Sequence, residues 1–237
     1  WLATQPPPPP TPAARPVGAN IRSIDVSAAN EDVISDVLGA SSPHQAAEFL
    51  RSMVRDVDDQ IAMRLWTQGS DVKASFAGRG WLAQRIFSRN RQGELIVEHE
   101  LFTVDDARQG QGLATTVLAN SIETYQGLDV SRVVVHANID VGGYTWAKFG
   151  FVPNEDSWDD LCSDLREDAR YIRDEVARSY LLKLLRDPTP QAIWELSDTA
   201  EGKQLLLGTD WYGELDLHHP LAMARFNRYV RRSRRKM

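Results

Sequence analysis

The sequence contains only one cysteine, Cys162, among its 237 residues. A single thiol excludes an internal disulfide and a zinc site built from cysteines, and it is typical of a protein that does not depend on an oxidising compartment. No apolar run approaches the ~18 residues that a membrane helix needs. The proline-rich start also does not have the basic and then apolar pattern of a secretory signal. We therefore expect no membrane association and a cytoplasmic location.

The composition is that of an ordinary globular protein, with 42% hydrophobic and 25% charged residues, enough to bury one core. The net charge of -6 argues against a generally nucleic-acid-binding surface. A local basic run, RYVRRSRRKM, occupies residues 228–237. Its arginines either contact phosphates or are the solvated charges that a helix C-terminus favours. No aromatic stacking platform accompanies them, so we expect no nucleic-acid partner.

The N-terminal segment is rich in proline and begins with Trp1 rather than methionine. We expect either a cleaved chain or the C-terminal part of a longer polypeptide. Residues 4–16, TQPPPPPTPAARP, favour an extended polyproline II conformation, so we interpret residues 1–19 as a linker. The alternative is that residues 6–10 supply a PxxP ligand for an aromatic groove.

The most informative stretch is ELIVEHELFTVDDARQGQGLATTVLA, residues 94–119. The turn at 90–93 and the β-rich run after it predict a strand, and Gly110, Gly112 and Ala114 keep bulk away from the start of a following helix. Backbone N–H groups at a helix N-terminus have no intrahelical partners and lie at the positive end of the helix dipole. The stretch therefore predicts an anion site that needs no basic side chain.

Val104, followed five residues later by QGQGLA, resembles the Q/R-x-x-G-x-G/A signature of the GNAT superfamily of N-acetyltransferases. Two neighbouring segments are similar to that family as well: RVVVHAN at 132–138 would be the next strand, and VGGYTWAKFGFVP at 141–153 the short helix that ends in a Gly-Phe pair. The resemblance covers roughly residues 70–155. It implies an α/β (α+β) fold with a mixed, mostly antiparallel sheet flanked by helices. It also implies acetyl-CoA as cofactor, bound by Val104, Gln109, Gly110, Gln111, Gly112, Leu113, Ala114 and Asn138.

Acetylation of an amine needs a base, and Glu98 lies where several members of the family place a catalytic glutamate. Glu100, two residues on, is expected on the same face of the strand. The alternative is that the two acids only mark solvent exposure or an ion pair. His99 points to the opposite face and His136 lies on the next strand. Without a third ligand at recognisable spacing, we expect no metal site.

The acid that protonates the leaving thiolate is the point at which the sequence departs from the family. Trp146 occupies the place where many members carry a tyrosine, and its indole N–H only donates a hydrogen bond. Tyr144 is the candidate substitute, although two helical residues are about 200° apart, so the two side chains do not both face the thioester. Asn138 lies one position off the family's usual spacing for its contact with the pantetheine arm.

Outside this stretch, the sequence predicts further elements. We expect a strand at 20–27, a short helix from Asn30 to Gly39, a long amphipathic helix from Pro43 to about residue 67, and strands within 71–89. We divide the folded part into a GNAT-like domain, residues 20–155, and a helical extension, residues 156–237. In that extension we expect helix over 158–185 with one apolar stripe, another short helix from Thr189, a strand at 211–217 and a last helix from Pro220. It either completes the sheet after a helical insertion or forms a separate docking subdomain.

Two functional hypotheses follow. The first is an acetyl-CoA-dependent N-acyltransferase acting on a small-molecule or protein amine. The second is a catalytically degraded GNAT-fold docking module of a larger assembly, held through the linker or the C-terminal extension. Such modules resemble domains appended to bacteriophage virion proteins, which would make the protein a virion component.

Overall fold

The structure is a computed structural model that describes residues 21–138 and 142–234. The proline-rich segment 1–19 and the last basic residues, Arg235 and Lys236, on which the sequence made predictions, lie outside the described residues. Within them the fold is mixed α/β, with one open sheet of mostly antiparallel strands, as the sequence predicted. No described helix is long and apolar enough to cross a membrane.

The strands pair in the order β1-β2-β3-β4-β5-β6-β8-β7. The pairs β1/β2 and β5/β6 are parallel, and all other neighbours in this order are antiparallel. Their bounds are β1 (Ile21–Ala28), β2 (Ile61–Gln68), β3 (Asp71–Gly78), β4 (Trp81–Arg89), β5 (Leu95–Val104), β6 (Val130–Ala137), β7 (Val152–Pro153) and β8 (Trp211–Asp216).

The helices fall into two groups along the chain. The first group comprises α1 (Glu31–Leu38), α2 (Pro43–Leu50), η1 (Arg51–Val54), η2 (Asp106–Arg108), α3 (Leu113–Gly127) and α4 (Gly142–Lys148). The second group comprises α5 (Glu155–Ala169), α6 (Glu175–Leu184), α7 (Ala192–Asp198), α8 (Ala200–Leu206) and α9 (Pro220–Arg234).

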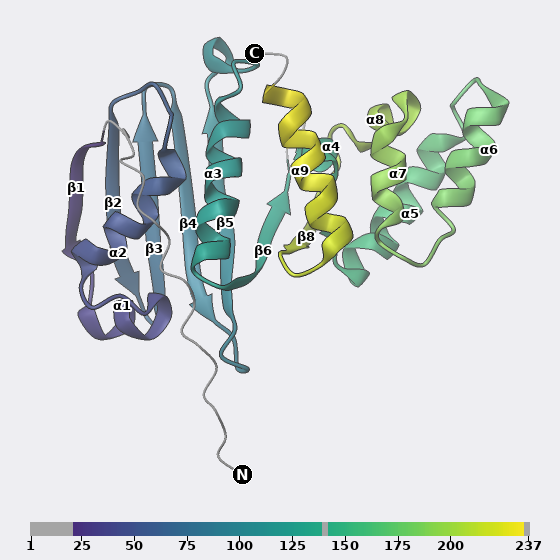
Figure 1. Cartoon of the computed structure of the whole chain (residues 1–237). Helices are drawn as coiled ribbons and strands as arrows, with labels where there is room; N and C mark the ends of the chain where they lie inside the picture. Colours follow the sequence, from purple (N-terminus) through teal and green to yellow (C-terminus); the bar gives the residue numbers. More distant parts are fainter. Residues whose placement is uncertain (1–20, 139–141, 235–237) are drawn as a thin grey trace.

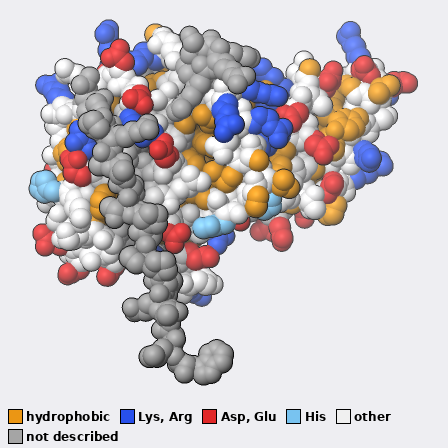
Figure 2. Space-filling model, in the orientation of Figure 1, with side chains coloured by type: hydrophobic (Ala, Val, Ile, Leu, Met, Phe, Trp, Pro, Cys, Tyr) orange, Lys and Arg blue, Asp and Glu red, His pale blue; other side chains and the backbone are white. Residues whose placement is uncertain are grey.

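One face of the sheet is covered by α1, α2, α3 and α9 (Figure 1). The strand residues that point toward these helices are buried, as in the alternating pattern of β4. A row of paired residues on the other face is only partly buried or exposed, and it runs through Trp66, Lys73, Ile86, Glu98, Val134 and Glu214. Val134 is only partly buried, whereas Val133 and Val135, which point to the helices, are buried. Acidic and basic side chains are mixed over the face drawn in Figure 2.

The first two helices begin after residues whose side chains cap them. The side chain of Asn30 accepts a hydrogen bond from the amide of Val33, and that of Ser42 accepts one from Gln45. Each satisfies a helix-terminal donor that would otherwise have no partner. Gly39 closes α1 in the left-handed conformation, with φ of 66°, as a residue without Cβ does most easily.

The long helix predicted from Pro43 to residue 67 is wrong. Helix α2 ends at Leu50 and passes into the 3-10 turn η1, and Asp56 then takes a positive φ of 60°, which a continuing α-helix excludes. Residues 61–68 form a strand in which Ile61, Met63 and Leu65 are buried in alternation. Apolar residues four positions apart lie on one face of a helix and also on one face of a strand, where side chains alternate. The spacing alone therefore did not distinguish a helix from a strand.

The apolar stripe predicted across residues 158–185 is also wrong in part. The segment forms two helices, because α5 ends at Ala169 and Asp174 starts α6 by accepting hydrogen bonds from the amides of Val176 and Ala177. The new helix has its own phase, which leaves Val176 81% and Tyr180 42% exposed. The short helix after Thr189 begins two residues later than Pro190, at Ala192.

The C-terminal third completes the sheet. Strand β8 pairs with β6 along residues 132–137 and 211–216, and it separates β6 from the short edge strand β7. Of the two alternatives that the sequence left open, the helical insertion followed by a late strand is the observed one. Helices α5 to α8 lie beyond β8 in Figure 1.

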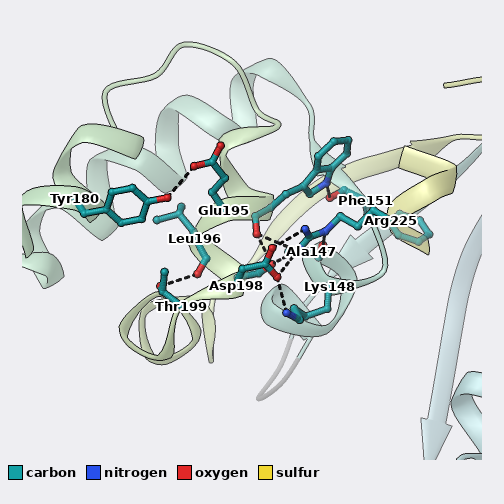
Figure 3. Close-up of polar contacts among 11 residues, drawn as sticks. Ala147, Lys148, Phe151, Tyr180, Glu195, Leu196, Asp198, Thr199 and Arg225 are labelled. Atoms are coloured by element: carbon teal, nitrogen blue, oxygen red, sulfur yellow. Dashed lines mark hydrogen bonds and ion pairs between the residues drawn. The ribbon is translucent and has the colours of Figure 1, made fainter. Parts of the chain in front are cut away.

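The C-terminal helices are connected by a polar network around Asp198 at the end of α7 (Figure 3). Arg225 of α9 donates hydrogen bonds to both carboxylate oxygens, at 2.9 and 3.0 Å, and Lys148 of α4 lies 2.7 Å from one of them. Burial would by itself raise the pKa of Asp198, but the hydrogen bonds from Arg225 and Lys148 outweigh it and lower the pKa to about 2.

Because of this network, we expect the folded protein to lose stability in acid. Because the folded pKa of Asp198 lies below the ordinary value of 3.8, its contribution is present above pH 3.8 and is lost as the pH falls toward 2. The carboxylate is 50% exposed, so we discount the shift and expect about 1 kcal/mol. Urea unfolding of the wild type and of Asp198→Asn between pH 5 and 2 measures it. An unchanged free-energy difference between the two proteins over this range would contradict the assignment.

Candidate functional site

The loop between β5 and α3 is built by two glycines and two glutamines. Gly110 and Gly112 have positive φ values of 73° and 79°, a conformation that residues with a Cβ rarely adopt. The Gln109 side chain donates to the Val104 carbonyl at 3.2 Å, and Gln111 donates to Ala107 at 2.8 Å. These bonds hold the loop against the end of β5 while the chain turns into α3.

The amides at the start of α3 are free. Gly112 caps the helix with its carbonyl, which accepts from Thr116, but it provides no side-chain cap. Within residues 21–138 and 142–234, the backbone N–H groups from Gly110 to Thr115 have no hydrogen-bond acceptor. Several unpaired donors at the positive end of a four-turn helix are what an anion site requires, and the binding of an anion here stays a prediction.

An open cavity of about 700 Å³ adjoins this helix start. Its lining includes Gln111, Leu113 and Thr116 of the loop and α3, and Arg79 and Gly80 of the turn between β3 and β4. Three carboxylates and two guanidinium groups also reach it: Asp56, Asp58, Asp105, Arg79 and Arg108. One of the two cations is already engaged, because Arg108 lies 3.4 Å from Asp59 and donates to the Arg79 carbonyl.

Strand β5 contains a bulge just before this loop. Gln84 pairs with Leu101 and Ile86 pairs with Glu98, so only Arg85 stands opposite the two residues His99 and Glu100. The bulge changes the phase of the strand. Leu95, Val97 and His99 face the helices before it, whereas Phe102 and Val104 pack toward the core after it.

Strands β5 and β6 separate at the position of this bulge in β5. Their pairing ends with His99 and Val135, although β5 continues to Val104 and β6 to Ala137. Residues 101–104 therefore have a ladder partner only in β4, and Glu100, in the bulge, has none in either strand. Their backbone groups on the β6 side are left for other partners.

A small cavity of about 50 Å³ lies beside the separation, on the helix-covered face. It is enclosed by Arg85 and Phe102 of the sheet, by Ala114 and Leu118 of α3, by Thr145 and Trp146 of α4, and by Phe149, which follows α4. The Trp146 ring packs 5.8 Å from His99 and 4.8 Å from Phe151. The side chains of Trp146 and Phe149 thus lie beside the separated strands.

The two glutamates predicted on β5 lie on the open face of the sheet. Glu98 is exposed between Ile86 and Val134, one pair before the strands separate. Among the described residues its carboxylate has no hydrogen-bond or ion-pair partner. Glu100 is also exposed and lies 3.3 Å from the ammonium group of Lys73. The two acids are close in sequence but differ in their partners.

The remaining sequence candidates lie elsewhere. Tyr144 does not line the small cavity: its ring has Lys148 and Lys203 over it, at 6.0 and 5.2 Å, and burial raises the pKa of its hydroxyl. Asn138 is exposed at the end of β6 and its amide is 3.4 Å from His136. His136 stacks on Tyr212 and contacts Asp210 at 2.7 Å, so it does not meet His99.

Sequence reasoning missed Arg85, a buried charged residue of the site. The exposed fraction of Arg85 is 1%, and it occupies the buried phase of β4, between Ala83 and Phe87. A charge on the apolar face of an alternating strand was a readable signal, because such a residue is rarely buried without a partner. His99 and Tyr125 lie next to it, joined by a hydrogen bond of 3.0 Å between Nε2 and the hydroxyl.

No known protein-family model and no curated protein matches the chain. The fold class follows from the structure, whereas the resemblance to the GNAT superfamily remains a prediction that stands on the motif itself.

Proposed function

We propose that the chain is an N-acyltransferase that uses an acyl-CoA donor, with acetyl-CoA as the reference donor, and transfers the acyl group to a small-molecule or protein amine. The observation that carries the proposal is the set of free amides from Gly110 to Thr115 at the start of α3. They lie at the end of a strand that is bulged and separated from its parallel neighbour. We place this activity in the cytoplasm.

The residues fit the two ends of the coenzyme differently. The free amides suit a pyrophosphate, and the left-handed Gly112 leaves room for it, since no Cβ stands over the helix start. The space beside the strands is only about 50 Å³, which is too small for a pantetheine arm. Binding of the arm therefore requires Trp146 and Phe149 to move.

When bound, the coenzyme would supply an activated acyl group; the rest of the chemistry falls to this chain. Unpaired amides of residues 100–104 would donate hydrogen bonds to the carbonyl oxygen that gains negative charge. Glu98 would take a proton from the incoming amine, which would approach from the open face. Tyr144, set apart from the cavity, is the weaker candidate for the acid, and water would serve because a thiolate is a good leaving group.

Calorimetry with acetyl-CoA tests the proposal directly. Saturable binding with a dissociation constant below millimolar supports it. Absence of heat at millimolar acetyl-CoA, with the circular dichroism spectrum of a folded protein, contradicts it.

Gly112→Asp should weaken coenzyme binding on the order of a hundredfold, because a carboxylate would stand at the phosphate position and repel it. Gly112→Asn is the matched control, since it adds the same bulk in the same backbone conformation without the charge. We expect Gly112→Asn to retain most of the affinity in the same calorimetric titration. Equal losses in both variants would mean that bulk or backbone strain, rather than the phosphate, explains the result.

One observation favours a second function, a docking module in a larger assembly such as a virion, without catalysis. Trp146 and Phe149 fill the space that a coenzyme arm would need. A module of this kind would assemble with itself or a partner and would show no affinity for coenzyme A. Analytical ultracentrifugation together with the calorimetric titration separates the two functions.

A further inference from the structure

Helix α5 presents a stripe of exposed side chains opposite its buried face. Its apolar residues, such as Trp158 and Leu165, pack into the core. On the other side, Asp160 and Asp164 are exposed one turn apart, and Tyr171 follows in the turn that continues the helix, with 81% of its surface exposed. Residues four, seven and eleven positions apart lie on one side of a helix. Asp160, Asp164 and Tyr171 therefore form one surface, which we call the α5 stripe.

Helix α9 presents a stripe with the same spacing and the opposite charge. Leu221 is 67% exposed at its start, and Arg228 and Arg232 are exposed seven and eleven residues later. We call these three residues the α9 stripe. In the α5 stripe, the apolar residue and the two acids have the same spacing when they are counted in the reverse direction. Two helices with this relation match when they lie antiparallel.

The charges of the two stripes have no ion-pair partner among residues 21–138 and 142–234. The helix dipole favours acids in the first turn of a helix and bases in the last turn. Asp160, Asp164 and Arg228 lie outside those turns. The dipole also gives no reason for a tyrosine and a leucine to stay exposed at the matching ends of the two stripes.

We propose that the α9 stripe of one copy of the chain packs antiparallel on the α5 stripe of a second copy. The exposed apolar side chains meet at one end of this contact and bury surface there. The opposite charges meet along the rest of it, and they fix the direction and the register. The facing pairs are Leu221 with Tyr171, Arg228 with Asp164, and Arg232 with Asp160.

The contact joins two different surfaces, so it continues from copy to copy into a ring or a chain. Helix α9 lies over the sheet and α5 lies beyond β8, so the two stripes belong to separate parts of one copy (Figure 1). Eleven helical residues span about 17 Å, and a contact of that length buries less than the ~800 Å² per partner of a standard interface. We therefore expect weak association, with a dissociation constant of about 10–100 µM. It does not depend on the proposed acyltransferase function.

Sedimentation velocity of the full chain at about 5–500 µM tests the contact. At about 0.05 M salt the average sedimentation coefficient should rise with protein concentration. At about 0.5 M salt the dissociation constant should be at least tenfold higher, because exposed charges are screened. The variant Asp160→Lys, Asp164→Lys and the variant Arg228→Glu, Arg232→Glu should each be monomeric over the same range. An equal mixture of the two should associate again, because each variant carries the charges that the other now requires.

The matched control is Asp159→Lys, Asp168→Lys, which changes the net charge by the same amount on exposed positions of α5 outside the stripe. It should associate like the wild type. Circular dichroism checks that each variant is folded, and a chain with all four reversals should associate without mixing. A wild type that is monomeric at every concentration overturns the proposal. Association that persists in either reversed variant, or a mixture that stays monomeric, overturns it as well.

Discussion

Replacement of Glu98 by glutamine is expected to reduce the turnover of acyl-CoA by about 10²–10⁴-fold while the dissociation constant of the coenzyme stays unchanged. The carboxylate lies on the open face, one pair before β5 and β6 separate, and coenzyme binding is assigned to other atoms. Glutamine has the same shape but accepts no proton. Release of free thiol, followed with a panel of amines, measures the rate, and calorimetry measures the affinity.

Glu100→Gln is the matched control for this prediction. Glu100 is on the same strand and the same open face, but its carboxylate lies 3.3 Å from the ammonium group of Lys73 and is therefore already in an ion pair. We expect its turnover to remain within a few-fold of the wild type. An equal loss in the two variants would point to a general effect of negative charge near the acceptor, and no loss in Glu98→Gln would remove this residue as the base.

The parts of the fold that the sequence predicted well are those with a local cause. Asn30 and Ser42 start helices because their own side chains satisfy the first amides, and Gly110 and Gly112 make the turn because their backbone conformations suit glycine. Strand β8 was readable from its alternation alone. In each case the residues that determine the structure lie within a few positions of it.

The predictions were wrong where the structure of a segment depends on contacts with residues far away in the sequence. Residues 61–68 form a strand because β1 and β3 pair on either side of it, and neither pairing is visible in the local spacing. The bulge in β5 is visible in the sequence pattern in one way. The residues that face the core occupy odd positions up to His99 and even positions from Phe102. The sequence could not show that this bulge faces a buried Arg85, or that side chains of α4 occupy the space beside it.

Removal of the Arg225 side chain should have the largest effect on stability. In the Arg225→Met variant we expect the free energy of unfolding to fall by about 2–3 kcal/mol, as measured by urea denaturation at pH 7. Arg225 is 12% exposed and joins three helices, because it donates to Ala147 of α4 at 3.2 Å and to Trp194 and Asp198 of α7 at 2.9 Å (Figure 3). Methionine keeps the aliphatic stem but removes these hydrogen bonds. Ala147, Trp194 and Asp198 each keep one other donor, from Gly150, Ser197 and Lys148 respectively.

Arg64→Met is the control, since Arg64 also has an acidic partner, Asp25 at 3.6 Å, but is 57% exposed and should cost less than about 1 kcal/mol. The double variant Arg225→Met, Asp198→Asn separates the ion pair from the backbone contacts. If the pair dominates, Asp198→Asn adds little further loss once Arg225 is gone.

Because Ala147 is next to Trp146, loss of the contact between Arg225 and Ala147 should also loosen α4. We therefore expect Arg225→Met to bind acyl-CoA at least as well as the wild type at temperatures below its unfolding transition. Weaker binding there would show that a rigid α4 holds the donor rather than excludes it.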